Sequence, residues 1–391
     1  MISDEKLVEF CKEAIKNQSY SGHEDKVAQV MKKHMEEFGF DEVTIEKYGS
    51  VLGKIKGKRP GKTILMDGHI DTVEVIDKDK WDHDPFGAEE VDGKIYGRGT
   101  SDMKGSVTAM ITAAARLVEE TNKDFAGEIC VSCTVHEECF EGISSREISK
   151  KCKPDFVIIG EATSGTVKIG QRGRAEVIVE TEGVSCHSSN PDKGVNAVYM
   201  MIPVIEEIKK IIPNEHPILG KGILELTDIK SFPYPGASVV PNLCRATYDR
   251  RTLVGEDEKV VLGQIEEAIE RAKAKVPGLK ARAYIAEGEE KCWTGDTIVA
   301  KRFFPAWCYD EKNEYIQKAL KGLKDAGIDT KISHFSFCTN GSHFCGEAGI
   351  VGIGYGPSEE FLAHVRNEYI EVEQLKKACK GFQCILKELT K

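Results

Sequence analysis

Short apolar segments that run directly into polar residues alternate with helical segments over the first part of the chain. Residues 63–66, 128–135 and 156–159 are three such predicted strands, and residues 104–118 form an Ala-rich helix between the first two. This alternation predicts an α/β sheet with helices on both faces. Open α/β sheets bind their ligands beyond the carboxyl ends of the strands. The polar residues that follow these strands are therefore the first candidates for a functional site.

The alternation stops near residue 171 and returns near residue 294. Between these points the sequence predicts a compact α+β unit of the ferredoxin-like, split-βαβ type. Its strands are residues 175–182, 224–229, 244–249 and 281–286, and its helices are residues 195–212 and 259–273. We therefore expect an α+β domain at residues 173–292, inserted between the two parts of a larger α/β domain, residues 1–172 and 293–391. A chain of 391 residues is long enough for both.

Charge, hydropathy and cysteine usage argue against several classes of partner. The net charge of -10 disfavours a general affinity for nucleic acid or anionic membranes. No apolar run is long enough to span a bilayer, and the N-terminal residues show no signal-peptide pattern. The 13 cysteines are therefore interpreted as reduced thiols of a cytoplasmic protein. Cys130 and Cys133 lie three apart on a predicted strand and face opposite sides, so we expect two separate core thiols rather than a metal site.

The residues that follow the predicted strands are rich in metal-binding side chains. Carboxylates and an imidazole gathered at one sheet edge would be costly without a partner, and divalent cations would remove that cost. Such a donor set suits zinc, with cobalt or manganese also possible. Taken singly, each residue is explained more simply as a helix cap, a loop residue or a solvated turn. Their joint occurrence favours a metal site; the residues are His69, Asp71, Asp102, Glu137, Glu138 and Glu161.

Several segments resemble the signature segments of a co-catalytic zinc hydrolase family. They are residues 68–73 (Gly-His-Ile-Asp-Thr-Val), residues 96–105 (Tyr-Gly-Arg-Gly-Thr-Ser-Asp-Met-Lys-Gly) and the pair Glu137-Glu138. The family's C-terminal ligand segment resembles Gly356-Pro357, Ala363-His364 and Asn367-Glu368. That family contains acetylornithine deacetylase, succinyl-diaminopimelate desuccinylase, aminoacylase and carboxypeptidase G. The resemblance covers nearly the whole chain, with the segments in the right order.

The resemblance implies a zinc-peptidase-like catalytic domain with an inserted lid and dimerisation domain. It also implies two zinc ions, with Asp102 bridging them. His69 and Glu161 would complete one site, and Glu138 and His364 would complete the other.

Catalytic roles also follow from the resemblance. Glu137 is the expected general base, which takes a proton from water and passes it to the leaving nitrogen. Asp71 is expected to orient the His69 ring from behind. Spacing alone does not tell which of Glu137 and Glu138 is the base. Related enzymes hold the peptide bond after the bridging Asp in the cis form, so the bond at residues 102–103 is expected to be cis.

Two histidines compete for the last ligand place. His343 lies in residues 339–343, which are predicted to be a loop, whereas His364 follows the Gly-Pro pair of the ligand segment. We therefore expect His343 to lie outside the ligand set. Residues 136–140 (His-Glu-Glu-Cys-Phe) lack the second histidine of an H-E-x-x-H helix, so a zincin site is not expected.

The predicted insertion contributes three candidate residues. Residues 183–189 resemble a Gly-x-x-x-His-Ser segment whose histidine, here His187, stabilises the oxyanion, commonly from a neighbouring subunit. Residues 249–251 resemble an Asp-x-Arg segment whose arginine, here Arg251, binds the substrate carboxylate, a task that suits a guanidinium group. Asn242 is expected to help bind substrate. Without the resemblance, His187 would be a surface residue and Arg251 a salt-bridged residue at a strand end. Because the histidine of this segment commonly acts from a neighbouring subunit, the resemblance also predicts a homodimer.

The sequence supports more than one function. The leading hypothesis is an amidohydrolase that acts on N-acyl amino acids or related small carboxylates. The alternatives are a dipeptidase or carboxypeptidase of the same family, a mononuclear zinc enzyme, and a non-catalytic metal-binding protein. Residues 81–86 and 339–343 look closest to a subgroup of selenium-metabolism-linked hydrolases, and Asn340 stands where the family usually has Asp.

Overall fold

The computed structural model describes residues 2–391, which form two compact units. Unit 1 comprises the chain up to Gln171 together with Glu289–Ala300 and Trp307–Lys391. Unit 2 comprises Arg172–Gly288 and Lys301–Ala306. The chain crosses between the two units more often than a single insertion at residues 173–292 would require. Strands β15, Glu287–Lys291, and β16, Thr297–Lys301, form a β-hairpin that leads the chain into unit 1, and a short segment then returns to unit 2.

A mixed sheet forms the centre of unit 1. Within residues 2–391 it has nine strands in the order β1-β2-β6-β3-β7-β20-β8-β18, and β19 also pairs with β8. The four central strands β6, β3, β7 and β20 run parallel, so their carboxyl ends lie at one edge. The bounds are β1 Glu42–Ile45, β2 Val51–Lys56, β3 Arg59–His69, β6 Ala126–Thr134, β7 Phe156–Ile159, β8 Val167–Gln171, β18 Trp307–Cys308, β19 Ile332–Phe335 and β20 Val351–Gly354.

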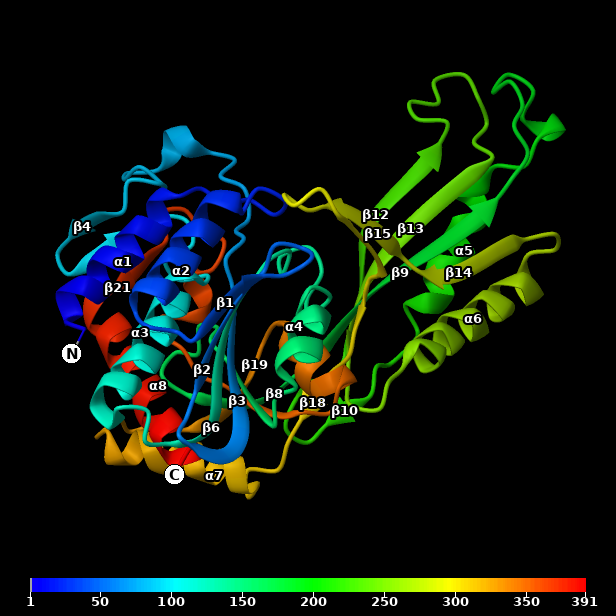
Figure 1. Cartoon of the computed structure of the whole chain (residues 1–391). Helices are drawn as coiled ribbons and strands as arrows, with labels where there is room; N and C mark the ends of the chain where they lie inside the picture. Colours follow the sequence, from blue (N-terminus) through cyan, green and yellow to red (C-terminus); the bar gives the residue numbers. More distant parts are fainter. Residues whose placement is uncertain (1) are drawn as a thin grey trace. The chain divides into compact units, whose positions relative to one another are not determined.

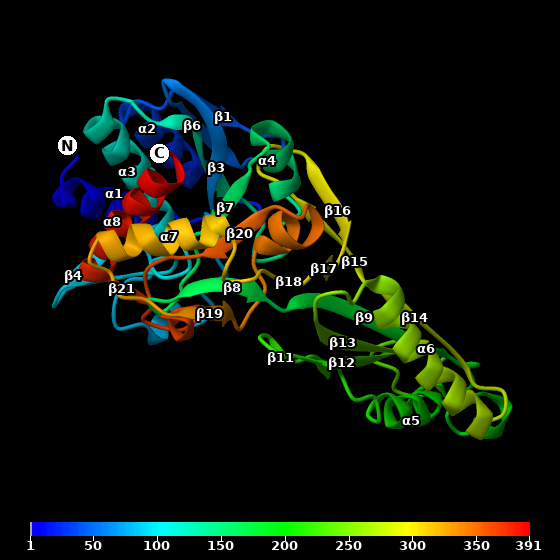
Figure 2. The same cartoon turned by 90° about the horizontal axis from the view of Figure 1, so that it is seen from below.

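Helices cover both faces of this sheet, as the alternating pattern predicted. On β3, Ile64 and Met66 pack into one core and Leu65 into the other, as expected for side chains that alternate along a strand. The larger core is closed by α1, α2, α3, α7 and α8, and the smaller by α4 and the π-helical turn η3 (Figures 1 and 2). These elements are α1 Asp4–Lys16, α2 Asp25–Glu37, α3 Lys104–Thr121, α4 Ser145–Cys152, α7 Glu314–Asp325, η3 Ser342–Glu347 and α8 Val372–Leu389.

The two cysteines of β6 confirm that side chains on this strand alternate between the two faces of the sheet. Cys133 lies in the larger core and Cys130 in the smaller one, both fully buried. Among the residues that the structure describes, none of the thirteen cysteines forms a disulfide bond. Within residues 2–391, no helix has both the length and the apolar character needed to cross a membrane.

A small second sheet in unit 1 joins two distant parts of the chain. Strand β5, Lys94–Tyr96, pairs with β4, Glu89–Val91, and with β21, Tyr369–Glu371. Tyr369 stands opposite Tyr96. The segment after β5 and the segment before β21 are therefore held side by side. Two short 3-10 turns flank this region; they are η1 Lys78–Lys80 and η4 Glu360–Leu362.

Unit 2 has the predicted ferredoxin-like topology. Its strands follow the order β12-β13-β9-β14 and are all antiparallel, with helices α5 and α6 packed against the sheet. A fifth strand, β17, pairs with β9 and was not expected, because two residues carry no periodic pattern. The main elements are β9 Gly173–Glu182, α5 Ala197–Ile208, β12 Ile223–Phe232, β13 Leu243–Thr252, α6 Glu258–Lys275, β14 Lys280–Ile285 and β17 Phe303–Phe304. Shorter pieces are η2 Pro191–Lys193, β10 Glu215–His216 and β11 Gly220–Lys221.

Candidate metal centre

The carboxyl ends of the four central parallel strands of unit 1 supply most of the predicted ligands. His69 is the last residue of β3, and Glu137 and Glu138 follow β6 after a short turn. Glu161 lies two residues beyond β7, and His364 comes from the loop after β20. Asp102 stands two residues before the first residue of α3. The sheet thus gathers residues that are far apart in sequence.

His69 is surrounded by carboxylates. Its Nε2 lies 2.9 Å from Oδ1 of Asp102, 3.5 Å from Oε1 of Glu161 and 3.9 Å from Oε2 of Glu137. Potential ligand atoms of His69, Glu137 and Glu161 all lie within 4.8 Å of one another, and all three residues are buried. This spacing suits a single cation.

The second imidazole meets the opposite oxygen of the same aspartate. His364 Nε2 lies 3.1 Å from Oδ2 of Asp102 and 3.0 Å from Oε2 of Glu138. Potential ligand atoms of His69, Asp102 and Glu138 also lie within 4.8 Å of one another. Asp102 therefore faces one histidine with each carboxylate oxygen, which is the arrangement that a bridging ligand needs.

The tautomer of His69 exposes a lone pair to these carboxylates. Its Nδ1 lies 2.9 Å from the backbone carbonyl oxygen of Asp71, which can only accept, so Nδ1 carries the proton. In the neutral ring, Nε2 then presents its lone pair to the oxygens of Asp102 and Glu161. A cation between these atoms turns that repulsion into attraction.

The charge balance of the cluster also calls for cations. It holds four carboxylates and two imidazoles, so even two fully protonated rings would leave excess negative charge; the groups are His69, Asp102, Glu137, Glu138, Glu161 and His364. Burial raises the pKa of Glu137 well above its usual range and that of Glu161 to about 8. Burial opposes a charged His69 ring, but the carboxylate of Glu161 and the hydrogen bond that a protonated Nε2 donates to Asp102 hold its pKa well above the usual value, and a metal ion would take the place of that proton. Oε1 of Glu137 is buried without a hydrogen-bond partner among the described residues. The donor set therefore fits divalent metal ions.

Asp71 faces the His69 ring and also makes contacts that the sequence did not predict. Its carboxylate lies 3.6 Å from Nδ1 of His69, and the closer contact to that ring comes from its own backbone carbonyl. The carboxylate also accepts hydrogen bonds from the backbone N–H groups of Glu137 at 3.1 Å and Glu138 at 3.2 Å, and from the hydroxyl of Ser21 at 2.7 Å. These two amides follow β6 and have no sheet partner, so a buried acceptor must satisfy them. Asp71 thus supports two ligand segments at once.

His343 lies outside the cluster, as predicted, but not in a loop. It belongs to the π-helical turn η3. Its Nε2 lies 2.6 Å from the hydroxyl of Ser149 and its Nδ1 lies 2.7 Å from Glu347, so both ring nitrogens are already engaged.

The three candidates from unit 2 are found on its strand ends and loops. His187 is exposed, and its Nδ1 accepts the backbone N–H of Ser189 at 3.1 Å and meets its hydroxyl at 2.8 Å. A backbone N–H can only donate, so Nδ1 is the unprotonated nitrogen and Nε2 carries the hydrogen. Arg251 on β13 pairs with Asp249, Nε to Oδ1 at 2.7 Å. Asn242 is exposed directly before β13.

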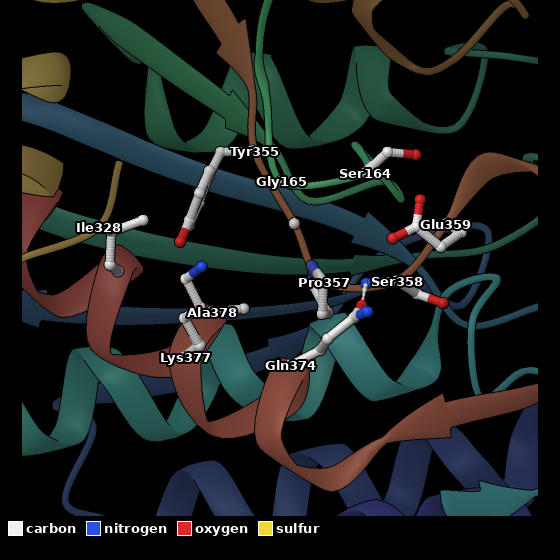
Figure 3. A pocket seen from close by; sticks show the side chains of 11 residues that line it. Ser164, Gly165, Ile328, Tyr355, Pro357, Ser358, Glu359, Gln374, Lys377 and Ala378 are labelled. Carbon is white, nitrogen blue, oxygen red and sulfur yellow. Dashed lines mark hydrogen bonds between the residues drawn. The ribbon is translucent and has the colours of Figure 1, made fainter. Parts of the chain in front are cut away.

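A separate cavity of about 240 Å³ lies in unit 1 beside the loop that follows β20. Figure 3 shows Ser358 at its wall, where the backbone N–H of Ser358 donates to Oε1 of Gln374 at 2.7 Å. None of the predicted metal ligands lines this cavity. It is therefore distinct from the metal cluster.

The fold and the cluster together define a metal-dependent hydrolase. A model of peptidase family M20/M25/M40 matches residues 65–388, and the chain belongs to this family. It is therefore a metal-dependent amidohydrolase or peptidase. The peptide bond between Asp102 and Met103 is cis, as the resemblance predicted.

Relatives in sequence cover most of the chain. The uncharacterized protein YgeY of Escherichia coli (strain K12) is 33% identical over 368 residues, which span 93% of this chain and 89% of that protein. Succinyl-diaminopimelate desuccinylase 2 of Ruegeria sp. (strain TM1040) is 31% identical over 257 residues, which span 62% of this chain and 64% of that enzyme.

Solved structures share the fold. Aminopeptidase PepT from Bacillus cereus ATCC 10987 superposes with a TM-score of 0.76 at 20% identity, covering 99% of both chains. The YXEP protein of Bacillus subtilis, a dinuclear metal binding peptidase, superposes with a TM-score of 0.70 at 14% identity, covering 99% of both chains. Both support a catalytic α/β domain with a second α+β domain.

Proposed function

We propose that this protein is a dinuclear zinc amidohydrolase that removes the acyl group from N-acyl amino acids or related small carboxylates. The observation that carries the proposal is the position of Asp102, whose two oxygens each face a different histidine within 3.1 Å. Co²⁺ or Mn²⁺ would fit the same nitrogen and oxygen donors.

The proposed metal ligands are those that the family resemblance implies, and the contacts of Asp102 with both histidines support them. Asp102 would bridge the ions, with His69 and Glu161 on one side and Glu138 and His364 on the other. Bound cations would polarise the scissile carbonyl and make the attacking water more acidic.

Glu137 is proposed as the general base. It is buried beside the ligands, and its Oε1 has no hydrogen-bond partner among the described residues. A carboxylate with a free oxygen can accept the proton of the attacking water and return it to the leaving nitrogen. Because Asp71 fixes the backbone N–H groups of Glu137 and Glu138, the base and the neighbouring ligand are held together.

Unit 2 is proposed to supply substrate and transition-state contacts. The Ser189 contacts leave Nε2 of His187 as a hydrogen-bond donor, which is the role that an oxyanion requires. Arg251 and Asn242 would bind the substrate carboxylate, Arg251 through Nη1, the one guanidinium nitrogen that Asp249 does not engage.

We also propose that the protein is a cytoplasmic homodimer in which unit 2 pairs with its counterpart on a second copy. A reducing compartment fits thirteen cysteines of which none forms a disulfide bond in the described part of the chain. The net charge of -10 argues against nucleic acid and anionic membranes as partners.

The test combines metal counting with a substrate screen. Metal-free protein is reloaded with Zn²⁺ or Co²⁺, its metal content is measured, and N-acyl amino acids are compared with dipeptides as substrates. We expect two ions per chain and faster hydrolysis of the N-acyl amino acids. One ion or fewer, unchanged by added zinc, would contradict the dinuclear site. Faster cleavage of dipeptides would favour the peptidase alternative.

A further inference from the structure

A fully buried carboxylate close to the metal cluster collects an unusual number of hydrogen bonds. Oε1 of Glu368 accepts the backbone N–H groups of Gly99 at 3.0 Å, Ser101 at 2.8 Å and Asp102 at 3.1 Å. Oε2 of the same side chain pairs with Nη1 of Arg98 at 2.6 Å. One side chain thus satisfies three backbone donors and one guanidinium.

The three amides belong to the loop that carries the proposed bridging ligand. This loop joins β5 to α3 and has no regular structure of its own. Buried N–H groups in such a loop need an acceptor, and Glu368 is that acceptor. One of these donors is the backbone N–H of Asp102, the proposed bridging ligand itself.

Further contacts hold the same two segments together. The backbone N–H of Gly97 donates to the carbonyl of Glu368 at 2.8 Å, and β21 begins at the next residue and pairs with β5. The hydroxyl groups of Ser101 and Ser358 lie 2.6 Å apart, and Ser358 is tied in turn to Gln374 (Figure 3). The loop therefore has two anchors, both on the C-terminal part of unit 1.

His364 precedes Glu368 by four residues in the same segment. This segment therefore both donates an imidazole to the cluster and fixes the backbone of the aspartate that this imidazole faces. Moving Glu368 would change the distance between His364 and Asp102 directly.

We propose that Glu368 is a positioning residue that sets the orientation of the bridging carboxylate of Asp102 and thereby the affinity of the metal centre. The proposal rests on the proposed dinuclear site. Hydrogen-bond partners of metal ligands typically change metal affinity by about 10–100-fold when they are lost.

The experiment replaces Glu368 in two ways. Glu368→Gln keeps the size of the side chain but places an amide NH₂ against either the Arg98 guanidinium or the loop N–H groups. Glu368→Asp keeps the charge but is too short to reach both. We expect each variant to bind Zn²⁺ about 10–100-fold more weakly in competition with a chromophoric chelator. We also expect the Co²⁺-loaded variants to show an altered visible absorption spectrum.

A matched control separates metal positioning from general stability. Glu207 in unit 2 is also a buried carboxylate with basic partners, among them Arg271. Glu207→Gln should lower the melting temperature of the metal-free protein and leave zinc affinity and the Co²⁺ spectrum unchanged.

The outcomes distinguish this inference from the function on which it rests. If the unmodified protein binds two ions and both Glu368 variants bind them equally well, the positioning role is excluded. If both variants are unfolded without metal, Glu368 supports the fold as a whole, which also overturns the proposal. An unmodified protein that binds fewer than two ions would instead contradict the dinuclear site.

Discussion

Two adjacent glutamates, Glu137 and Glu138, have different surroundings although the chain places them side by side. The Glu138 carboxylate meets His364, with Oε2 at 3.0 Å from Nε2, which is the position that its proposed ligand role needs. The Glu137 carboxylate keeps a buried oxygen without a partner among the described residues. Because Asp71 holds both backbones, the difference lies in the side chains alone.

Substituting each glutamate by glutamine should therefore give different results. Glu137→Gln should keep both metal ions and lose about 10²–10⁴-fold in kcat, because an amide cannot accept a proton from water. Glu138→Gln should lose part of the metal content. Metal analysis and steady-state kinetics on the two purified variants provide the measurement. Identical behaviour of the two variants would show that the division of roles is wrong.

Asn340, the residue that departs from the usual family pattern, has a matching partner in Asp67. Its Nδ2 donates to Oδ2 of Asp67 at 3.0 Å and to the hydroxyl of Thr134 at 2.8 Å. Its Oδ1 accepts the backbone N–H of Gly142 at 2.7 Å. An aspartate at position 340 would place a second carboxylate against Asp67 in a fully buried location. The amide at 340 is therefore required by the acid at 67.

A reciprocal exchange tests this pairing. Asn340→Asp should destabilise the protein by about 1–3 kcal/mol, because Asp67 loses a hydrogen-bond donor and faces a second buried carboxyl group. The double variant Asp67→Asn/Asn340→Asp should recover most of that loss, because the amide at position 67 can again donate to the acid. Urea unfolding of the two single variants and the double variant gives the coupling energy. Additive losses would show that the two residues do not act as a pair.

At the scale of elements, the sequence predicted the strands that have a clear apolar pattern and missed the short strands that only tertiary contacts define. The apolar runs of β3, β6 and β7 predicted both the strands and the site at their ends, because burial on both faces leaves a clear pattern. Strands β17 and β21 have two and three residues, too few to show a period.

Side-chain contacts between distant segments were equally invisible in the sequence. Glu368 was recognised as part of a ligand segment, but nothing in the sequence showed that it accepts the backbone of residues 99–102. The carboxylate of Asp71 was expected to face His69, which it does at 3.6 Å, but nothing in the sequence showed that it also holds the turn after β6. Such partners depend on which amides the fold leaves without a sheet or helix bond.

In unit 2, one buried glutamate joins the two helices. Glu207 on α5 pairs with Arg271 on α6 at 3.2 Å and with Lys210 at 2.6 Å, and it also contacts Lys275. Hydrogen bonds from Lys210 and Lys275, together with that of Arg271, lower the pKa of Glu207 from 4.5 to about 2. The carboxylate is thus more easily ionised in the folded protein than in the unfolded chain.

This shift predicts how stability depends on pH. Since the folded pKa is depressed, the stabilisation by Glu207 is fully present above pH 4.5 and is lost as the pH falls towards about 2. Glu207→Gln should therefore melt at a lower temperature than the unmodified protein at pH 7, and the difference should narrow between pH 4.5 and 2. Thermal melts across this range, with the exposed neighbour Glu206→Gln as control, test the prediction. A difference that stays constant with pH would contradict it.

At the scale of the whole molecule, the proposed chemistry needs both units. The metal ligands and Glu137 all lie in unit 1, whereas His187 and Arg251 lie in unit 2. The resemblance to the family favours a dimer in which His187 acts on the site of the other copy. His187 would donate a hydrogen bond to the negative charge that develops on the carbonyl oxygen of the substrate only in the transition state.

Loss of His187 should therefore affect turnover more than substrate binding. His187→Ala should lower kcat by about 10²–10³-fold, the usual effect of removing one oxyanion donor, and change KM little. A variant that remains fully active would remove His187 from the mechanism.

Mixing two inactive variants tests whether the residue acts across the dimer. His187→Ala chains keep Glu137, and Glu137→Gln chains keep His187. If His187 acts in trans, a mixed dimer contains one complete site, made from Glu137 of one chain and His187 of the other. Statistical exchange gives about half mixed dimers, so about one quarter of the sites should recover. Activity is measured after subunit exchange has been verified with differently tagged chains, and variants mixed with themselves serve as the control. Verified exchange without recovered activity would show that each chain uses its own His187.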